Sequence, residues 1–157
     1  ALPVAEAAEF FPSLPRAAAI LKSMQDVGLG YLSLNRRADT LSGGESQRIK
    51  IAAELAKASA WKLEEDGKRA LFILDEPTSG LHFNEVALLL AALFRLRDAG
   101  HTILCVEHHK DLLNAADYLV DMGPGAGRHG GNIVAEGSPA DVASNPEAPT
   151  SPWLVPR

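Results

Sequence analysis

The stretch "ALFILDEP", residues 70–77, indicates the fold more directly than any other part of the sequence. Its apolar run from Ala70 to Asp75 is typical of a strand that is buried on both faces of a parallel sheet. A second such run, "TILCV" at Thr102 to Val106, follows a segment, Asn84 to Ala99, with valine and leucine in helical register. A strand, a helix and a strand in this order favour an α/β fold with a mostly parallel sheet flanked by helices.

Helical patterns precede this unit. Pro3 to Phe11 and Arg16 to Val27 predict two short helices, and Glu45 to Ala58 predicts a longer one. On the longer helix, one stripe of mostly small residues is expected to pack, namely Ile49, Ala52, Ala53 and Ala56. We therefore expect a helical region at residues 1–60 and a sheet-containing core at residues 61–153.

Shorter elements follow the second strand. We predict a helix at Lys110 to Ala116, strands at Tyr118 to Met122 and Asn132 to Ala135 around a glycine-rich loop, and a closing helix at Pro139 to Ser144. The charged stretch Trp61 to Arg69 is interpreted as a solvated surface loop. The last residues, Leu154 to Arg157, match the first part of a thrombin cleavage site, so we leave them out of the functional argument as a tag-cleavage scar.

Composition excludes several classes of protein. The 157 residues are 46% hydrophobic and carry a net charge of -5, which fits a globular chain and argues against nucleic-acid binding through the overall charge of this chain. The single cysteine, Cys105, lies in an apolar run without a disulfide partner, which suits a reducing compartment. No stretch reaches the ~20 apolar residues of a membrane span, and we expect a cytoplasmic location.

Titratable residues end both apolar runs, where ligands bind in open parallel sheets. Asp75 fits a magnesium ligand and Glu76 fits a base that activates water, while His108 after the second strand fits a hydrogen-bond donor to a γ-phosphate. The blander alternatives are that residues 75–78 simply form a turn and that His108 is a satisfied polar residue. His108 and His109 would face opposite sides of a strand, so they could not readily share a metal.

The stretch "TLSGGESQR", residues 40–48, predicts a helix start. Ser42 and Glu45 have the spacing of a capping box, which would satisfy early amides of the helix. Capping does not explain two consecutive glycines, Gly43 and Gly44, which remove side chains where the backbone could approach an anion. Phosphate binding accounts for all four positions.

Three motifs in this order, "LSGGESQR", "LFILDEPTSGLH" and "ILCVEHH", resemble the signature motif, the Walker B strand with its D-loop, and the switch histidine of an ABC-type ATPase. The D-loop at residues 79–82 and the segment at residues 116–139 are similar to those of the UvrA family, the damage-sensing subunit of the bacterial excinuclease. The N-terminal segment is similar to the part of UvrA that leads into the signature motif of its second nucleotide-binding domain. The resemblance thus covers nearly the whole chain.

The resemblance implies a role for each matching residue. The signature residues would contact the γ-phosphate of an ATP held by the opposing domain; they are Ser42, Gly43, Gly44 and Glu45. Asp75 would support Mg²⁺ through water, Glu76 would be the catalytic base, and His108 would be the switch residue. The D-loop would signal between two ATP sites; it consists of Ser79, Gly80, Leu81 and His82.

The resemblance also implies partners. ATP-driven closure of a homodimer would be coupled to binding of damaged duplex DNA and to loading of a UvrB-type partner, with no membrane involved. The phosphate loop G-x-x-x-x-G-K-[ST] and the paired cysteines of the family's zinc modules do not occur in this sequence. We therefore expect a C-terminal half-domain that is inactive alone, with zinc only in upstream parts of a longer parent. The alternatives are a UvrA paralogue in drug resistance, a nucleotide-binding subunit of a transporter, and an interaction module without catalysis.

Overall fold

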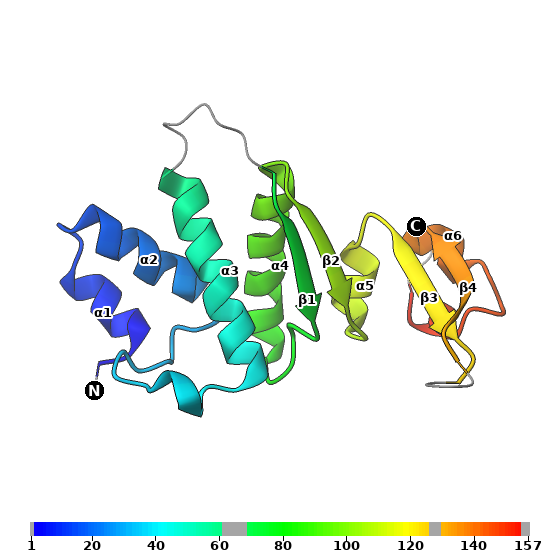
Figure 1. Cartoon of the computed structure of the whole chain (residues 1–157), viewed down its shortest axis with the longest axis horizontal. Helices are drawn as coiled ribbons and strands as arrows, with labels where there is room; N and C mark the ends of the chain where they lie inside the picture. The colour runs from blue at the N-terminus through cyan, green and yellow to red at the C-terminus, as the bar shows by residue number, and fades with distance from the viewer. Residues whose placement is uncertain (1, 61–68, 126–129, 155–157) are drawn as a thin grey trace. The chain divides into compact units, whose positions relative to one another are not determined.

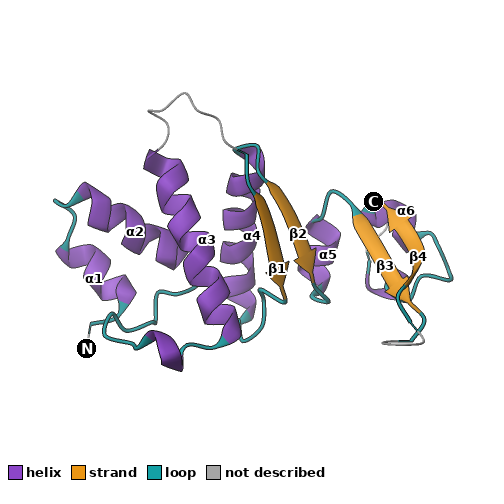
Figure 2. Ribbon diagram, viewed as in Figure 1, coloured by secondary structure: helices purple, strands orange, loops and turns teal. Residues whose placement is uncertain are grey.

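The computed structural model describes residues 2–60, 69–125 and 130–154, which form two compact units, residues 1–106 and 107–157. The first unit holds four helices and a two-stranded sheet, and the second holds a hairpin with short helices (Figures 1 and 2). The division that we expected after residue 60 falls inside the first unit, where α3 packs on both α2 and α4.

The first unit is built around a strand, helix and strand. Its elements are α1 (Val4–Phe10), α2 (Pro15–Asp26), a 3₁₀ turn η1 (Ala38–Thr40), α3 (Gly43–Ala60), β1 (Leu71–Asp75), α4 (Phe83–Asp98) and β2 (Thr102–Val106). β1 and β2 pair in parallel, with Leu71 opposite Thr102 and Asp75 opposite Val106. The α/β fold with a parallel strand pair is thus confirmed, and both strands end at the same edge.

α4 carries the core of this unit. Its buried residues repeat with helical spacing, as the sequence predicts, because one face of the helix packs inward. The buried residues of α4 are Val86, Leu89, Ala92, Leu93 and Leu96. Half-buried Leu90 lies at the border of this face.

The buried face of α3 differs from the expected stripe. Ala53 is exposed, and Ile49 and Ala56 are only half-buried. The buried face is displaced by one residue and consists of Arg48, Ile51, Ala52 and Leu55. Of the predicted stripe only Ala52 is buried, because the buried face includes the charged Arg48, which is 1% exposed, whereas the prediction counted apolar residues alone.

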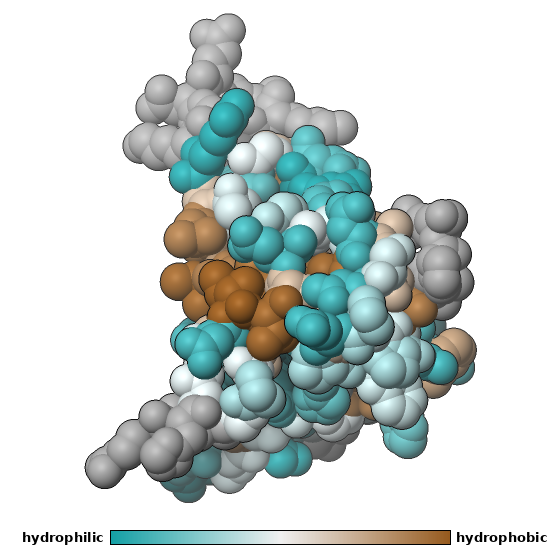
Figure 3. Space-filling view, turned by 90° about the vertical axis from the view of Figure 1, so that its right-hand side faces the viewer, coloured by the Kyte–Doolittle hydropathy of each residue, from teal (hydrophilic) through white to brown (hydrophobic). Residues whose placement is uncertain are grey.

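Within the described residues of the first unit, only one face of the β1–β2 sheet is covered. Along both strands exposure alternates, and α4 packs against the sheet, standing beside β1 in Figure 1. The expectation of burial on both faces is therefore wrong within the first unit, since side chains on the other face are exposed there. Apolar side chains of the sheet consequently reach the surface, namely Leu71, Ile73, Leu104 and Val106, each at least 55% exposed. A space-filling view likewise shows hydrophobic residues gathered at the surface of the molecule (Figure 3).

The second unit is an antiparallel hairpin with small helices. It contains α5 (Lys110–Ala115), β3 (Leu119–Gly123), β4 (Asn132–Gly137), α6 (Pro139–Ala143) and a 3₁₀ turn η4 (Ser151–Trp153). A bulge between Asp121 and Met122 shifts the register of the hairpin. The unit has its own apolar cluster, made of Ala135, Val142, Ala148 and Leu154. This packing gives Leu154 a structural role, although we set it aside with the terminal residues.

The helix and strand bounds agree with the predicted ones to within about two residues. The surface loop expected at Trp61 to Arg69 lies outside the described residues except for Arg69, and so does part of the glycine-rich loop. Among the helices that the structure describes, none combines the length and the apolar character needed to cross a bilayer.

Candidate functional site

The start of α3 is closed by the predicted capping box. Ser42 lies just before the helix, and its Oγ accepts a hydrogen bond from the amide of Glu45 at 3.1 Å. In return Oε2 of Glu45 accepts from the amide of Ser42 at 2.7 Å. The reciprocal bonds satisfy two groups that a helix start would otherwise leave unpaired.

Glu45 is held entirely by protein contacts. The residue is 7% exposed, and its Oε1 accepts a hydrogen bond from the hydroxyl of Tyr31 at 2.8 Å. The bond from the Ser42 amide, and then that from Tyr31, lower the pKa of Glu45 below its ordinary value. Burial, followed by the Glu45 carboxylate, raises the pKa of Tyr31. The contact of Glu45 with a nucleotide therefore stays a prediction, while its capping role is observed.

The two glycines of the motif have different surroundings. A Cβ on Gly44 would lie 2.8 Å from the carbonyl oxygen of Ser79 and 3.0 Å from Nη1 of Arg48, whereas a Cβ on Gly43 would meet nothing within 4 Å. Gly44 is thus required for close packing of α3 against the loop after β1. Of the two, only Gly43 has open space where a side chain would stand.

The first turn of α3 presents donors to solvent. Ser42 and Gly43 are exposed, and within the described residues the amides of Gly43 and Gly44 donate no hydrogen bond. Because α3 is 18 residues long, its dipole adds partial positive charge at this end. The arrangement suits an anion such as a phosphate group.

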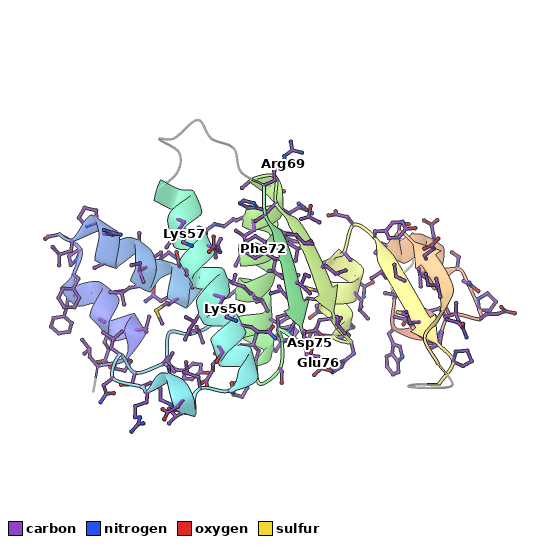
Figure 4. The ribbon with its side chains drawn as sticks, viewed as in Figure 1. Lys50, Lys57, Arg69, Phe72, Asp75 and Glu76 are labelled. Atoms are coloured by element: carbon purple, nitrogen blue, oxygen red, sulfur yellow. The ribbon has the colours of Figure 1, made fainter. Side chains whose placement is uncertain are left out.

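The second half of the candidate site is the loop after β1. Asp75 ends the strand and Glu76 follows, both exposed, at the carboxyl end of the sheet (Figure 4). The amide of Glu76 donates to the carbonyl of Val106 at 2.9 Å, which extends the sheet pairing by one bond. Glu76 is the only described residue other than glycine with a positive φ, at 44°. Such a backbone costs about 1–3 kcal/mol and persists only where its surroundings hold it.

The loop then turns into α4. Pro77 and Thr78 are buried, and the amide of Ser79 donates to the carbonyl of Glu76 at 2.9 Å. Gly80 takes a φ of 76°, which favours glycine. His82 lies at the N-cap of α4, where its amide donates to the side chain of Glu85 at 2.8 Å. His82 thus starts a helix in addition to belonging to the expected D-loop.

Two adjacent side chains of α3, which the sequence analysis missed, bind this loop. Nε2 of Gln47 donates to the carbonyl of Asp75 at 2.8 Å, and Nη1 of Arg48 donates to the carbonyls of Pro77 and Ser79, both at 3.2 Å. These bonds join residues 28 to 31 positions apart. Their only local signal was a pair of adjacent polar residues in the first turns of the helix, three and four positions after Gly44.

His108 belongs to the second unit, two residues after the end of β2. Its side chain is 79% exposed, whereas that of the neighbouring Glu107 is 2% exposed. Oε2 of Glu107 accepts from the amides of His108 and His109, at 2.8 and 3.0 Å. His109 caps α5, where it accepts from the amide of Asp111. The signature residues and the residues after β1 thus share one unit, while the expected switch histidine lies in the other.

Metal binding would depend on more than this chain. Within the described part of the sequence, no three His, Cys, Asp or Glu side chains gather closely enough to hold a metal ion. A single exposed carboxylate such as Asp75 fits magnesium, which usually keeps several waters and takes further oxygens from substrate phosphates. A hollow of about 500 Å³ between α3 and β1 includes Asp75 but neither Ser42 nor the glycines.

Comparison with known proteins identifies the relatives of the chain. It is 47% identical over 152 residues to the UvrABC system protein A of Haemophilus ducreyi, and 49% identical over 152 residues to that of Thermus thermophilus, with 97% of the chain covered in each case. The chain is homologous to part of UvrA. The solved structure of UvrA2 from Deinococcus radiodurans matches 98% of the chain with 44% identity and a TM-score of 0.84. No protein-family model matches the chain.

The UvrA-like chain is much shorter than these relatives. It spans 15% of each of the two UvrABC system proteins and 18% of the UvrA2 chain. Within that span the capped glycines, the acidic strand end and the histidine after β2 occur in the order of the ABC-type motifs.

Proposed function

We propose that the chain is the C-terminal part of the second nucleotide-binding domain of a UvrA-like repair ATPase. The observation that carries the proposal is the direct contact between the capped start of α3 and the acidic loop after β1. That contact supports a shared role for the start of α3, as the proposed anion-binding end, and Glu76, as the proposed base. The similarity to UvrA along almost the whole chain supports the same reading.

Each side of this contact would have its own task. The amides of Gly43 and Gly44 and the hydroxyl of Ser42 would bind the γ-phosphate of an ATP that the opposing domain holds. Asp75 would hold Mg²⁺ through water, and that ion supplies charge neutralisation at the phosphates. Glu76 would accept a proton from the attacking water, and His108 would donate a hydrogen bond to the γ-phosphate. Ser79 to His82 would carry the signal between the two ATP sites.

In the intact parent, closure around ATP would be coupled to binding of damaged duplex DNA and to loading of a UvrB-type partner. The parent would act as a cytoplasmic homodimer. A UvrA paralogue is the second candidate, because the 44% identity to UvrA2 is close to the 47–49% identity to the UvrABC system proteins. A transporter subunit has less support, since the relatives named here are all UvrA proteins.

The change Glu76→Gln in the full-length parent tests the proposed base. We expect ATP binding to remain and hydrolysis to fall by about 10²-fold or more, because glutamine keeps the shape of the side chain but cannot accept the proton. The measurements are equilibrium binding of a fluorescent ATP analogue and steady-state phosphate release.

The matched control is Glu9→Gln, which removes one charge from an exposed position of α1. It should leave both measurements unchanged. Turnover of the Glu76→Gln protein near the wild-type rate would overturn the assignment. Comparing the affinities of the same full-length parent for lesion-bearing and for undamaged duplex would distinguish a repair protein from a paralogue.

A further inference from the structure

The side chain of Arg48 occupies an unusual place for a cation. Among the described residues it is the largest fully buried side chain, and its Nε has no hydrogen-bond partner there. Its Nη1 donates to the backbone carbonyls of Pro77 and Ser79. Its charge also acts on the hydroxyl of Tyr31, whose pKa it lowers against the larger raising effects of burial and Glu45. An apolar side chain of similar size would fill the space without burying a charge. We therefore assign the role of the guanidinium to the hydrogen bonds that it donates to these carbonyls.

The carbonyls held by Gln47 and Arg48 together lie on both sides of the strained residue Glu76. Gln47 holds the carbonyl of Asp75, directly before Glu76, and Arg48 holds that of Pro77, directly after it. The second bond of Arg48 reaches Ser79, where the expected D-loop begins. Neighbouring positions of α3 thus hold alternate carbonyls of a single loop.

The helix start and the loop are also in direct steric contact. Gly44 lies so near to the carbonyl of Ser79 and to the end of Arg48 that no side chain fits between them. The loop cannot slide along α3 without breaking the bonds of Arg48. The start of α3 and the backbone around Glu76 are therefore held together by both steric contact and hydrogen bonds.

We propose that Arg48, assisted by Gln47, is a positioning residue that fixes the backbone of Glu76 and links the signature helix to the D-loop of its own domain. The proposal rests on the proposed function of this site. Arg48 does not touch the nucleotide in this scheme, because it is buried behind the loop. It acts on turnover through the orientation of Glu76.

The test uses the full-length parent with Arg48→Met, Arg48→Lys and Gln47→Ala. Misplacement of a catalytic group by about 1 Å can lower turnover about 10²-fold, so we expect Arg48→Met to lower kcat by about 10- to 100-fold. KM for ATP should stay within about twofold of the wild-type value, because the variant keeps the interactions that bind ATP equally in the ground state and the transition state. Arg48→Lys should recover only part of the loss, since one ammonium lacks the planar fork of the guanidinium.

A double-mutant cycle separates positioning from general damage. If Arg48 acts through Glu76, Arg48→Met should lower the residual turnover of the Glu76→Gln protein by less than about twofold. Hydrogen exchange should become faster in residues 76–81 but not in α4. The matched control is Arg16→Met on the exposed side of α2, which should change none of these readouts.

Three outcomes would overturn the proposal. The first is an unchanged kcat in folded Arg48→Met protein. The second is a loss of kcat in Arg48→Met that is no larger than its loss of folded protein, together with additive effects of Arg48→Met and Glu76→Gln in the double-mutant cycle. The third applies where Arg48→Met does not fold, and it is an unchanged kcat in both Arg48→Lys and Gln47→Ala. If the wild-type parent hydrolyses no ATP, or if Glu76→Gln keeps turnover, the proposed function itself fails instead.

Discussion

Replacing each glycine of the signature motif by alanine should show that Gly44 is needed for close packing against the loop after β1, whereas Gly43 is not. In Gly44→Ala the new Cβ would lie 2.8 Å from the carbonyl oxygen of Ser79, closer than such contacts are found. The end of Arg48, at 3.0 Å, cannot turn away freely because it is bonded to Pro77 and Ser79. In Gly43→Ala the added methyl group would meet nothing within 4 Å.

The expected magnitude follows from these contacts. Overpacking of this kind costs about 1–3 kcal/mol, whereas alanine regains up to about 1 kcal/mol of helix propensity. Gly44→Ala should therefore lower the free energy of unfolding by about 0.5–2 kcal/mol, which for a unit of this size lowers Tm by about 2–8 °C. Gly43→Ala should change the free energy of unfolding by no more than about 0.5 kcal/mol.

The assay is thermal unfolding of the chain followed by circular dichroism, with hydrogen exchange to assign the effect to the first unit. Exchange should become faster in residues 76–81 for Gly44→Ala only. Equal Tm values for the two variants, or a higher Tm for Gly44→Ala, would refute the close contact between α3 and the loop after β1.

Two further predictions concern Glu45 and the chain as a whole. Because the pKa of Glu45 is lower in the folded state, its contribution to stability is complete above its ordinary pKa of 4.5 and is lost as the pH falls below that value toward the folded pKa. Urea unfolding between pH 3 and 7 should show this loss, and Glu45→Gln should flatten that part of the profile, whereas an unchanged profile would contradict the capping role. The chain alone should release no phosphate from ATP above a no-protein control, because it lacks the lysine and backbone amides of a phosphate loop. Release that Glu76→Gln abolishes would contradict this expectation.

Local sequence patterns were sufficient for most of the first unit. Apolar runs predicted the positions of β1 and β2, and helical spacing predicted α4, because its apolar residues mark the face that packs inward. The capping box at Ser42 and Glu45 was also predictable, since its partners lie three residues apart.

What failed depended on residues that are distant in the sequence. The buried face of α3 includes an arginine whose partners lie 29 and 31 positions away, so hydropathy alone could not reveal it. The packing role of Gly44 likewise depends on Ser79, and the exposed face of the sheet depends on which segments lie against it. These features follow from tertiary contacts, which override local preference.

The two-stranded sheet also has a consequence for handling the chain in solution. Within the described residues, β1 and β2 pair only with each other, so each strand has an outer edge without a strand partner, next to an exposed apolar face. Open edges of this kind accept further strands from other molecules, and apolar faces promote colloidal association. Light scattering of the purified chain should therefore increase with concentration and with salt, which weakens the repulsion from its net charge of -5.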